Sequence, residues 1–309
     1  MDEASFINWL RGRIHCGDET VIVGAGSDDC AILRAPAGRI AVTTDMLLEN
    51  THFTADAVPE DVGWKAMAVN LSDLAASGCE PRWAVAAVGL RQGLPSDYGK
   101  RLAEGLLACA ERFGVSLVGG DTTAGKGPIS IAVTALGETL PGGPLLRSGA
   151  RPGDILAVTG ELGGSLLGKH LRFTPRVKEI RALLDLAPVH ACIDISDGLA
   201  LDLCRLMSES GCGAVIEEAL VPIADDAVAM AHRTGRDPLE HALADGEDFE
   251  LLLAIPLLSW QVISAAWPLP SIRTPLRCLG KATVDKAIRL LRRDGREEVL
   301  APKGYQHQW

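Results

Sequence analysis

The hydrophobic pattern of the chain changes repeatedly between a period typical of strands and one typical of helices. Runs rich in β-branched residues predict strands in the first half at residues 30–35, 39–45, 82–90, 115–120 and 129–138. Apolar positions three or four apart predict helices at 5–15, 61–77 and 96–113, the last capped by Ser96. The second half predicts a helix at 197–210 and strands at 154–160, 191–196, 213–218, 249–255 and 276–282.

A segment rich in glycine and proline interrupts this alternation near the middle of the chain. It runs from Leu140 to Asp154 and reads LPGGPLLRSGARPGD. Segments of this composition commonly join domains. A chain of 309 residues is long enough for two domains. The sequence therefore predicts an α/β (α+β) fold with domains at residues 1–140 and 141–309.

Composition narrows the range of functions. The formal net charge is -10 and aromatic residues make up 4% of the chain, which argues against a nucleic-acid partner. The longest apolar run, Leu251 to Leu258, is broken by Pro256 and is too short to cross a bilayer, so no membrane partner is expected. The eight cysteines form no C-x-x-C pair, and the N-terminus does not resemble a signal peptide. The sequence therefore predicts a cytoplasmic protein with reduced cysteines.

The stretch GDTTAGK at residues 120–126 nearly spells a phosphate-binding loop. Such a loop leads from a strand into a helix, whose N–H groups hold the phosphates. Here the chain continues into ISIAVTAL, which predicts a strand, and Gly127 stands where a Ser or Thr would bind magnesium. We therefore reject the phosphate loop. Lys126 remains open between a solvated turn residue and a phosphate contact, and Asp121 needs a separate explanation.

A set of carboxylates beside strands and glycines supplies that explanation. Its members are Asp28, Asp29, Asp45, Asp73, Asp121, Asp194 and Asp197, of which Asp45, Asp121 and Asp194 are expected at strand ends. Singly, each has a structural interpretation as a turn, helix-cap or solvated residue. Together they would converge where α/β proteins bind ligands, and their mutual repulsion would require cations. Oxygen ligands without Cys or His favour magnesium completed by substrate phosphates, so the set predicts magnesium-dependent phosphoryl chemistry.

The order of several motifs resembles the thiamine-monophosphate kinase family, within the superfamily of aminoimidazole ribonucleotide synthetase. The motifs are VTTDMLLENTHF, WKAMAVNLSDLAASGCEP, LVGGDTT, RSGARPGD, IDISDGLALDL, GEDFEL and a closing KGY. The resemblance implies a first domain whose mixed sheet forms a barrel across a homodimer, and a second domain whose sheet is packed by helices. It also implies that the γ-phosphoryl group of ATP is transferred to thiamine monophosphate, giving thiamine diphosphate.

Residue roles follow from the same resemblance. The first domain would bind ATP and metal and form the dimer, and the second would complete the active site. Magnesium ions, with potassium as a further candidate ion, would be held by Asp29, Thr43, Thr44, Asp45, Asp73, Asp121, Asp194 and Asp197. ATP would contact Gly120, Asp121, Arg147 and Ser196, and thiamine monophosphate would contact His52, Glu247 and Tyr305. The acceptor phosphate is already ionised near neutral pH, so no general base is assigned.

Structural interpretations of these residues remain open. Arg147 would otherwise be a solvated linker residue, His52 a packed histidine, Glu247 a turn residue and Tyr305 an anchor for the C-terminal tail. The chain also departs from the family pattern. Ser27 and Asp245 stand where the family usually has glycine, and Asp245 adds a negative charge beside the substrate motif.

Rival functions lie mostly within the superfamily. The alternatives are aminoimidazole ribonucleotide synthetase, selenophosphate synthetase and a nucleotide-binding maturation factor. Selenophosphate synthetase would need a reactive Cys in an N-terminal Gly-rich segment, of which Cys16-Gly17 is a poor version. The maturation factor would need a C-terminal Cys, whereas this chain ends in His307-Gln308-Trp309. A purely structural acidic protein would leave the ordered motifs unexplained.

Overall fold

The computed structural model describes residues 9, 12–14, 18–23 and 32–306. The chain forms two compact units. Unit 1 comprises Met1–Leu74 and Cys79–Thr139, and unit 2 comprises Ala75–Gly78 and Leu140–Trp309. Most of the helix expected at 5–15, as well as Asp28 and Asp29, lies outside the described residues.

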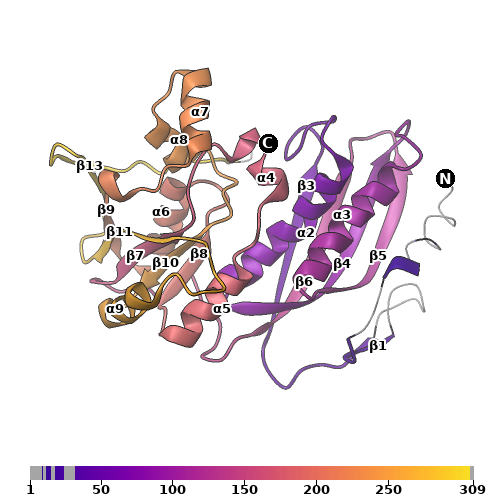
Figure 1. The fold of residues 1–309 in the computed structure, drawn as a ribbon, viewed down its shortest axis with the longest axis horizontal. Coiled ribbons are helices and arrows are strands. Elements are labelled where there is room, and N and C mark those ends of the chain that lie inside the picture. The colour runs from indigo at the N-terminus through magenta and orange to yellow at the C-terminus, as the bar shows by residue number, and fades with distance from the viewer. Residues whose placement is uncertain (1–8, 10–11, 15–17, 24–31, 307–309) are drawn as a thin grey trace. The chain divides into compact units, whose positions relative to one another are not determined.

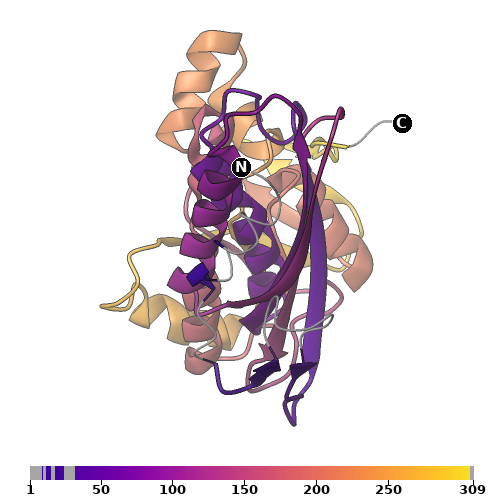
Figure 2. The same ribbon diagram turned by 90° about the vertical axis from the view of Figure 1, so that its right-hand side faces the viewer.

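Unit 1 is a mixed sheet with helices on one face. Its strands are β3 (Ile40–Leu48), β4 (Cys79–Arg91), β5 (Ser116–Gly125) and β6 (Ser130–Thr139), in the order β3-β6-β4-β5. Only β4 and β5 pair in parallel; the other pairings are antiparallel. Helices α2 (Pro59–Ala76) and α3 (Tyr98–Arg112) lie along the same face of this sheet (Figure 1, Figure 2). Two short strands, β1 (Val21–Val23) and β2 (Ile32–Leu33), pair with each other.

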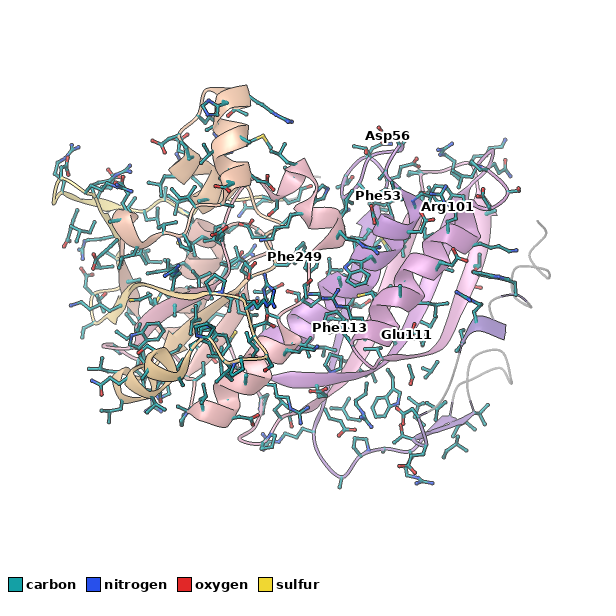
Figure 3. All side chains as sticks on the ribbon, in the orientation of Figure 1. Phe53, Asp56, Arg101, Glu111, Phe113 and Phe249 are labelled. Carbon is teal, nitrogen blue, oxygen red and sulfur yellow. The ribbon has the colours of Figure 1, made fainter. Side chains whose placement is uncertain are left out.

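Helices α2 and α3 pack closely because glycines lie at their contact. A Cβ atom at Gly63 would lie 1.9 Å from the carbonyl oxygen of Leu102, and one at Gly105 would lie 1.8 Å from that of Glu60. Arg101, marked on α3 in Figure 3, forms an ion pair with Glu60 at 2.7 Å. The helix pair is therefore fixed both by backbone contact and by charge, which gives α2 a defined position over the sheet.

Several local expectations were wrong in detail. Helix α3 begins after Asp97, whose side chain makes no capping hydrogen bond, so Ser96 is not its cap. Strand β5 continues to Gly125, which places Asp121 within a strand instead of after one. Asp45 likewise lies within β3, which extends to Leu48. As expected, the chain passes from β5 directly to another strand, β6, and this confirms that residues 120–126 are not a phosphate loop.

Unit 2 is built on a larger sheet. Its strands are β7 (Ile155–Thr159), β8 (Ala191–Asp194), β9 (Gly213–Glu217), β10 (Leu251–Ile255), β11 (Leu276–Thr283), β12 (Ile288–Leu291) and β13 (Glu297–Val299). Their order is β13-β12-β9-β11-β7-β10-β8, and all pairings are antiparallel except β12 with β9. The helices are η1 (Ser165–Leu167), α4 (Lys169–Arg172), α5 (Val177–Leu186), α6 (Leu199–Ser210), η2 (Glu218–Leu220), α7 (Asp225–Thr234), α8 (Pro238–Ala244) and α9 (Leu257–Ala266).

The core of unit 2 joins the sheet to helices α6 and α8. Val158, Ile193 and Leu252 of the sheet belong to the same buried cluster as Leu203 of α6 and Ala242 of α8. Both faces of strands such as β10 are buried, which explains why its sequence is continuously apolar. Across the described residues, no helix has the length and apolar character that a membrane crossing requires. The predicted mixed α/β fold is confirmed, and the predicted dimeric barrel stays a prediction.

Candidate active site

The interior of β3 brings a carboxylate and a hydroxyl to helix α2. Alternate strand residues face opposite sides of a sheet, and Thr43, Asp45 and Leu47 share the more buried side. α2 supplies Asp73, whose carboxylate accepts a hydrogen bond from the Thr43 hydroxyl. Burial, together with the charge of Asp73, raises the pKa of Asp45 to about 7. A cation bound to these oxygens would oppose both effects.

The donor chemistry of this pair fits magnesium. Asp45 and Asp73 offer carboxylate oxygens, and Thr43 adds a hydroxyl oxygen. Magnesium prefers such hard oxygen ligands and usually takes only one or two carboxylates from the protein. The residues present therefore fit the ion that the sequence predicts. Among the described residues, however, no group of three or more His, Cys, Asp or Glu side chains could hold a metal ion by itself.

The structure does not bring Asp121 to this pair within the sheet. Asp45 lies opposite Val133 of β6, Val133 opposite Ala86 of β4, and Ala86 opposite Gly120 of β5. Asp121 is thus one residue from this row, but it lies on the other edge strand. Three strand spacings amount to about 14 Å along the sheet. Asp29, the other predicted ligand in this part of the chain, lies outside the described residues.

Gly120 and Thr44, which lie next to Asp121 and Asp45 in the sequence, each have a structural role. A Cβ atom at Gly120 would lie 2.2 Å from the carbonyl oxygen of Ala86, so β5 can approach β4 only with glycine there. Thr44 is exposed on the opposite side of β3 from Thr43 and Asp45. Its hydroxyl donates to the carbonyl oxygen of Val133 and accepts from the Thr134 hydroxyl. The Thr44 side chain therefore does not join the Asp45–Asp73 pair.

His52 lies in the turn that follows β3. Its Nδ1 accepts a hydrogen bond from the Leu48 backbone N–H at 3.0 Å, and its carbonyl oxygen accepts from the fully buried Lys65 ammonium at 2.8 Å. The ring is half-buried and the neighbouring Phe53 is buried. These contacts hold the His52 ring in place, which is compatible with both the substrate role and the packed-histidine interpretation.

In unit 2, the loop after β8 brings together predicted residues that are far apart in sequence. The carbonyl oxygen of Ser196 accepts from the Glu247 N–H at 2.7 Å, and that of Asp197 accepts from the Tyr305 N–H at 2.9 Å. Asp194, the last residue of β8, is only 4% exposed. Backbone hydrogen bonds thus bring Glu247 and Tyr305 to the loop that contains Ser196 and Asp197, while the roles of these residues in binding stay predictions.

The motif that contains Glu247 has an unusual backbone. Glu247 and Phe249 have φ angles of 57° and 50°, in the left-handed region that residues other than glycine seldom adopt. The Phe249 N–H donates to the carbonyl oxygen of Ile195 at 2.8 Å, and the Phe249 ring, labelled in Figure 3, stacks on Phe173 with centroids 4.1 Å apart. Strained conformations of this kind persist only where the surroundings enforce them, and they are enriched at functional sites.

Two buried acidic residues, Asp248 and Glu250, flank Phe249 and anchor this motif to the rest of unit 2. The Asp248 carboxylate accepts from the Gly163 N–H and from the Ser165 hydroxyl, and burial raises its pKa to about 7. Burial also opposes ionisation of Glu250, but Arg176 and Lys169 outweigh it and lower the pKa. Sequence reasoning missed this network. Arg176 lies 74 positions from Glu250, and no local pattern could have connected them.

A second network missed from the sequence lies at Asp197. One Arg205 nitrogen donates to Asp197 Oδ2 at 2.6 Å and to Asp202 Oδ1 at 2.7 Å, and the other Asp202 oxygen accepts from the Asp197 N–H at 3.0 Å. Burial raises the pKa of Asp202 to about 6 in spite of these contacts. Asp197 is not the helix cap that its position suggested, because α6 is capped by Gly198. The sequence did offer one signal for this network, because Asp202 and Arg205 are three residues apart on a predicted helix and that spacing allows an ion pair.

Three further residues singled out from the sequence also have defined surroundings. Arg147 has an exposed side chain, and its carbonyl oxygen accepts from the Ser210 hydroxyl at 2.8 Å. Lys126 is exposed between β5 and β6. Asp245 accepts from His241 at 2.7 Å and forms an ion pair with Arg236 at 3.5 Å, so basic neighbours offset its charge.

Comparison with known proteins places this geometry in a family. The profile "AIR synthase related protein, N-terminal domain" matches residues 27–139, and the corresponding C-terminal domain matches residues 153–253. A thiamine-monophosphate kinase of Rhodopirellula baltica is 39% identical over 315 residues, covering 99% of this chain and 97% of that protein. The predicted resemblance is therefore confirmed across the whole chain.

Solved structures agree with the sequence comparison. The crystal structure of thiamine-monophosphate kinase from Stenotrophomonas maltophilia has a TM-score of 0.82 and 31% identity, covering 96% of this chain and 98% of that one. AaThiL complexed with AMPPCP and TMP has a TM-score of 0.77 and 28% identity, covering 99% and 97%. Hydrogenase maturation protein HypE in complex with ATP reaches 0.79 at 20% identity, a level that shows a shared fold alone.

Proposed function

The chain belongs to the thiamine-monophosphate kinase family, and we propose that it transfers the γ-phosphoryl group of ATP to thiamine monophosphate with the help of magnesium. The relatives named for this activity match nearly the full chain, and AaThiL was crystallised with AMPPCP and TMP. HypE, which represents the rival maturation-factor function, matches at lower sequence identity. The kinase therefore takes precedence over the other functions of the superfamily.

The Asp45–Asp73 pair is the observation that carries the magnesium part of this proposal. Asp45 has a pKa raised to about 7 by burial and by Asp73, so two carboxylates compete for ionisation at neutral pH. Bound magnesium would neutralise the phosphates and align them for in-line transfer. Asp45, Asp73 and the Thr43 hydroxyl would hold it. Asp29, Asp121, Asp194 and Asp197 are the further ligands that the family pattern suggests, with potassium as a further candidate ion.

The chain's own residues would then bind and orient the two phosphate esters. Gly120, Arg147 and Ser196 are the proposed contacts for ATP, and an exposed guanidinium such as that of Arg147 suits bidentate contact with phosphate oxygens. For thiamine monophosphate, the proposed contacts are Glu247 and Tyr305, which the backbone bonds to Ser196 and Asp197 bring together, and His52. No general base is required, because the acceptor phosphate oxygen is already ionised.

A homodimer formed through unit 1 is part of the proposal. Strand β3 is an edge strand, and its outer side presents Ile40, Val42 and Met46 with exposures of 42%, 63% and 56%. An apolar edge of this kind is normally covered, since it otherwise invites non-specific strand pairing. A second copy of the chain is the occupant that the family resemblance implies. We place the enzyme in the cytoplasm, which suits buried thiols such as Cys192 and Cys212.

The activity is tested by incubating the purified chain with ATP, thiamine monophosphate and magnesium and measuring thiamine diphosphate by chromatography. Product that requires both the enzyme and the metal supports the proposal. Absence of product with ample enzyme, magnesium and potassium would overturn it. Thermal shift with magnesium and AMPPCP separates the kinase from its relatives, because added thiamine monophosphate should then raise the unfolding temperature further.

A further inference from the structure

Arg205 connects a proposed metal ligand to a buried carboxylate. The guanidinium Nη1 donates to Asp197 at 2.6 Å and to Asp202 at 2.7 Å. Asp202 is fully buried and also accepts the Asp197 N–H, whereas the Asp197 side chain is 26% exposed. The Asp202 carboxylate is therefore held in place within the core. Asp197 is the accessible end, and its Oδ2 already has a cationic partner.

The contacts of Arg205 leave it able to move. Its side chain is 35% exposed, and both ion pairs use the same nitrogen. Because the head group is partly exposed, a side chain of this length can turn it into water while the stem stays on α6. A guanidinium and a divalent cation also repel each other when both approach the same carboxylate. The two cations therefore compete for Asp197.

We propose that Arg205 is a positioning residue that holds the Asp197 carboxylate while no metal is bound and lowers the affinity of that carboxylate for a divalent cation. The inference rests on the proposed function, which assigns Asp197 to magnesium. In this proposal Arg205 acts on the metal through Asp197. It sets the metal concentration at which this part of the site fills.

The test measures Mn²⁺ binding by electron paramagnetic resonance on the full chain without nucleotide. Arg205→Gln should bind Mn²⁺ roughly two- to fivefold more tightly than the wild type, the range expected for a partly exposed ion pair. Arg233→Gln removes the same charge from an exposed position on α7 and should leave the affinity nearly unchanged. In an Asp197→Asn background, Arg205→Gln should give no gain. Unchanged or weaker binding by a folded Arg205→Gln protein would overturn the proposal.

A second measurement uses the wild type and does not depend on the stability of the variant. The side-chain N–H signal of Arg205, assigned by nuclear magnetic resonance, should show slow hydrogen exchange without metal and faster exchange as Mg²⁺ is added. Protection that persists at saturating Mg²⁺ would contradict the displacement. Neither readout involves thiamine diphosphate formation, so failure of the kinase activity and failure of this inference are distinguishable.

Discussion

In unit 1 both influences on Asp45, its burial and the charge of Asp73, raise its pKa, whereas in unit 2 the pKa of the fully buried Glu250 is lowered. The difference lies in the neighbours. Glu250 accepts two hydrogen bonds from Arg176 at 2.6 and 2.5 Å and one from Lys169 at 3.1 Å. Burial of a carboxylate is therefore no guide to its role. Glu250, which the chain supplies with two cations, is neutralised within the fold, whereas Asp45 faces another carboxylate, and this is the pair that we propose holds a metal.

The largest expected effect concerns the structural side of this comparison. Arg176→Met removes the bidentate partner of Glu250 and leaves a buried carboxylate with only partial compensation. Loss of one partner from a buried ion pair typically costs about 3–5 kcal/mol. Urea unfolding of the metal-free chain would measure the loss, and Arg233→Met, at an exposed position, is the matched control. A change below about 1 kcal/mol would show that Glu250 does not depend on Arg176.

The next effect concerns the catalytic side. Asp73→Asn removes the negative charge that lies beside Thr43 and Asp45. The rate of thiamine diphosphate formation should therefore fall on the order of 10²-fold. Stability should be little changed or improved, because a repulsive pair is relieved. Glu111→Gln, on the exposed part of α3 marked in Figure 3, should keep the wild-type rate. Equal rates for the two variants would exclude Asp73 as a metal ligand.

A smaller effect concerns the pH dependence of folding stability through Asp248, a buried carboxylate of unit 2. The folded pKa of Asp248 is about 7, above its unfolded value, so the folded chain binds more protons than the unfolded chain between about pH 4 and 7. The stability that this group contributes is present at low pH and is lost as the pH rises through 7. The Asp248→Asn side chain is neutral at every pH. Between pH 5 and pH 8 the unfolding temperature of the wild type should therefore fall by roughly 2–4 °C more than that of the variant. Identical pH profiles would assign Asp248 an ordinary pKa.

The smallest expected effect is at Lys126. This residue is exposed on the connection between β5 and β6, and no helix follows it. Lys126→Ala should therefore change the KM for ATP by less than about twofold, the range of an ordinary surface substitution. A tenfold rise would identify Lys126 as a phosphate contact and would weaken the view that the phosphates are held mainly through magnesium and carboxylates, without a lysine.

Sequence patterns predicted the elements well because each depends on local periodicity. The strand around Val133 and the helix around Leu71 were found, as was the strand-to-strand path through Lys126. Strands β12 and β13 were missed, because β12 has only four residues and β13 has three, all exposed, which is too short for a clear alternation. Element ends were less accurate, since β5 continues through a glycine-rich stretch that resembles a turn.

The candidate site was only partly predictable for a physical reason. Motif order suggested Ser196, Glu247 and Tyr305 as binding residues, and backbone hydrogen bonds bring Glu247 to Ser196 and Tyr305 to the neighbouring Asp197, which the sequence alone did not indicate. Strand register, however, depends on long-range pairing, and it places Asp121 on the opposite edge of the sheet from Asp45. Arg176 was missed because nothing in the sequence around Glu250 indicates which residue will face it after folding, whereas Arg205 could have been found from its spacing to Asp202.

The most direct test of the account is calorimetric titration of Mg²⁺ into the nucleotide-free chain, with Asp73→Asn and Glu250→Gln in parallel. Asp73 represents the carboxylates that we propose hold a metal, and Glu250 represents those that the chain itself neutralises. We expect Asp73→Asn to lose most of the Mg²⁺ binding and Glu250→Gln, measured where it is folded, to retain the wild-type affinity. Wild-type Mg²⁺ affinity in a folded Asp73→Asn protein would contradict it.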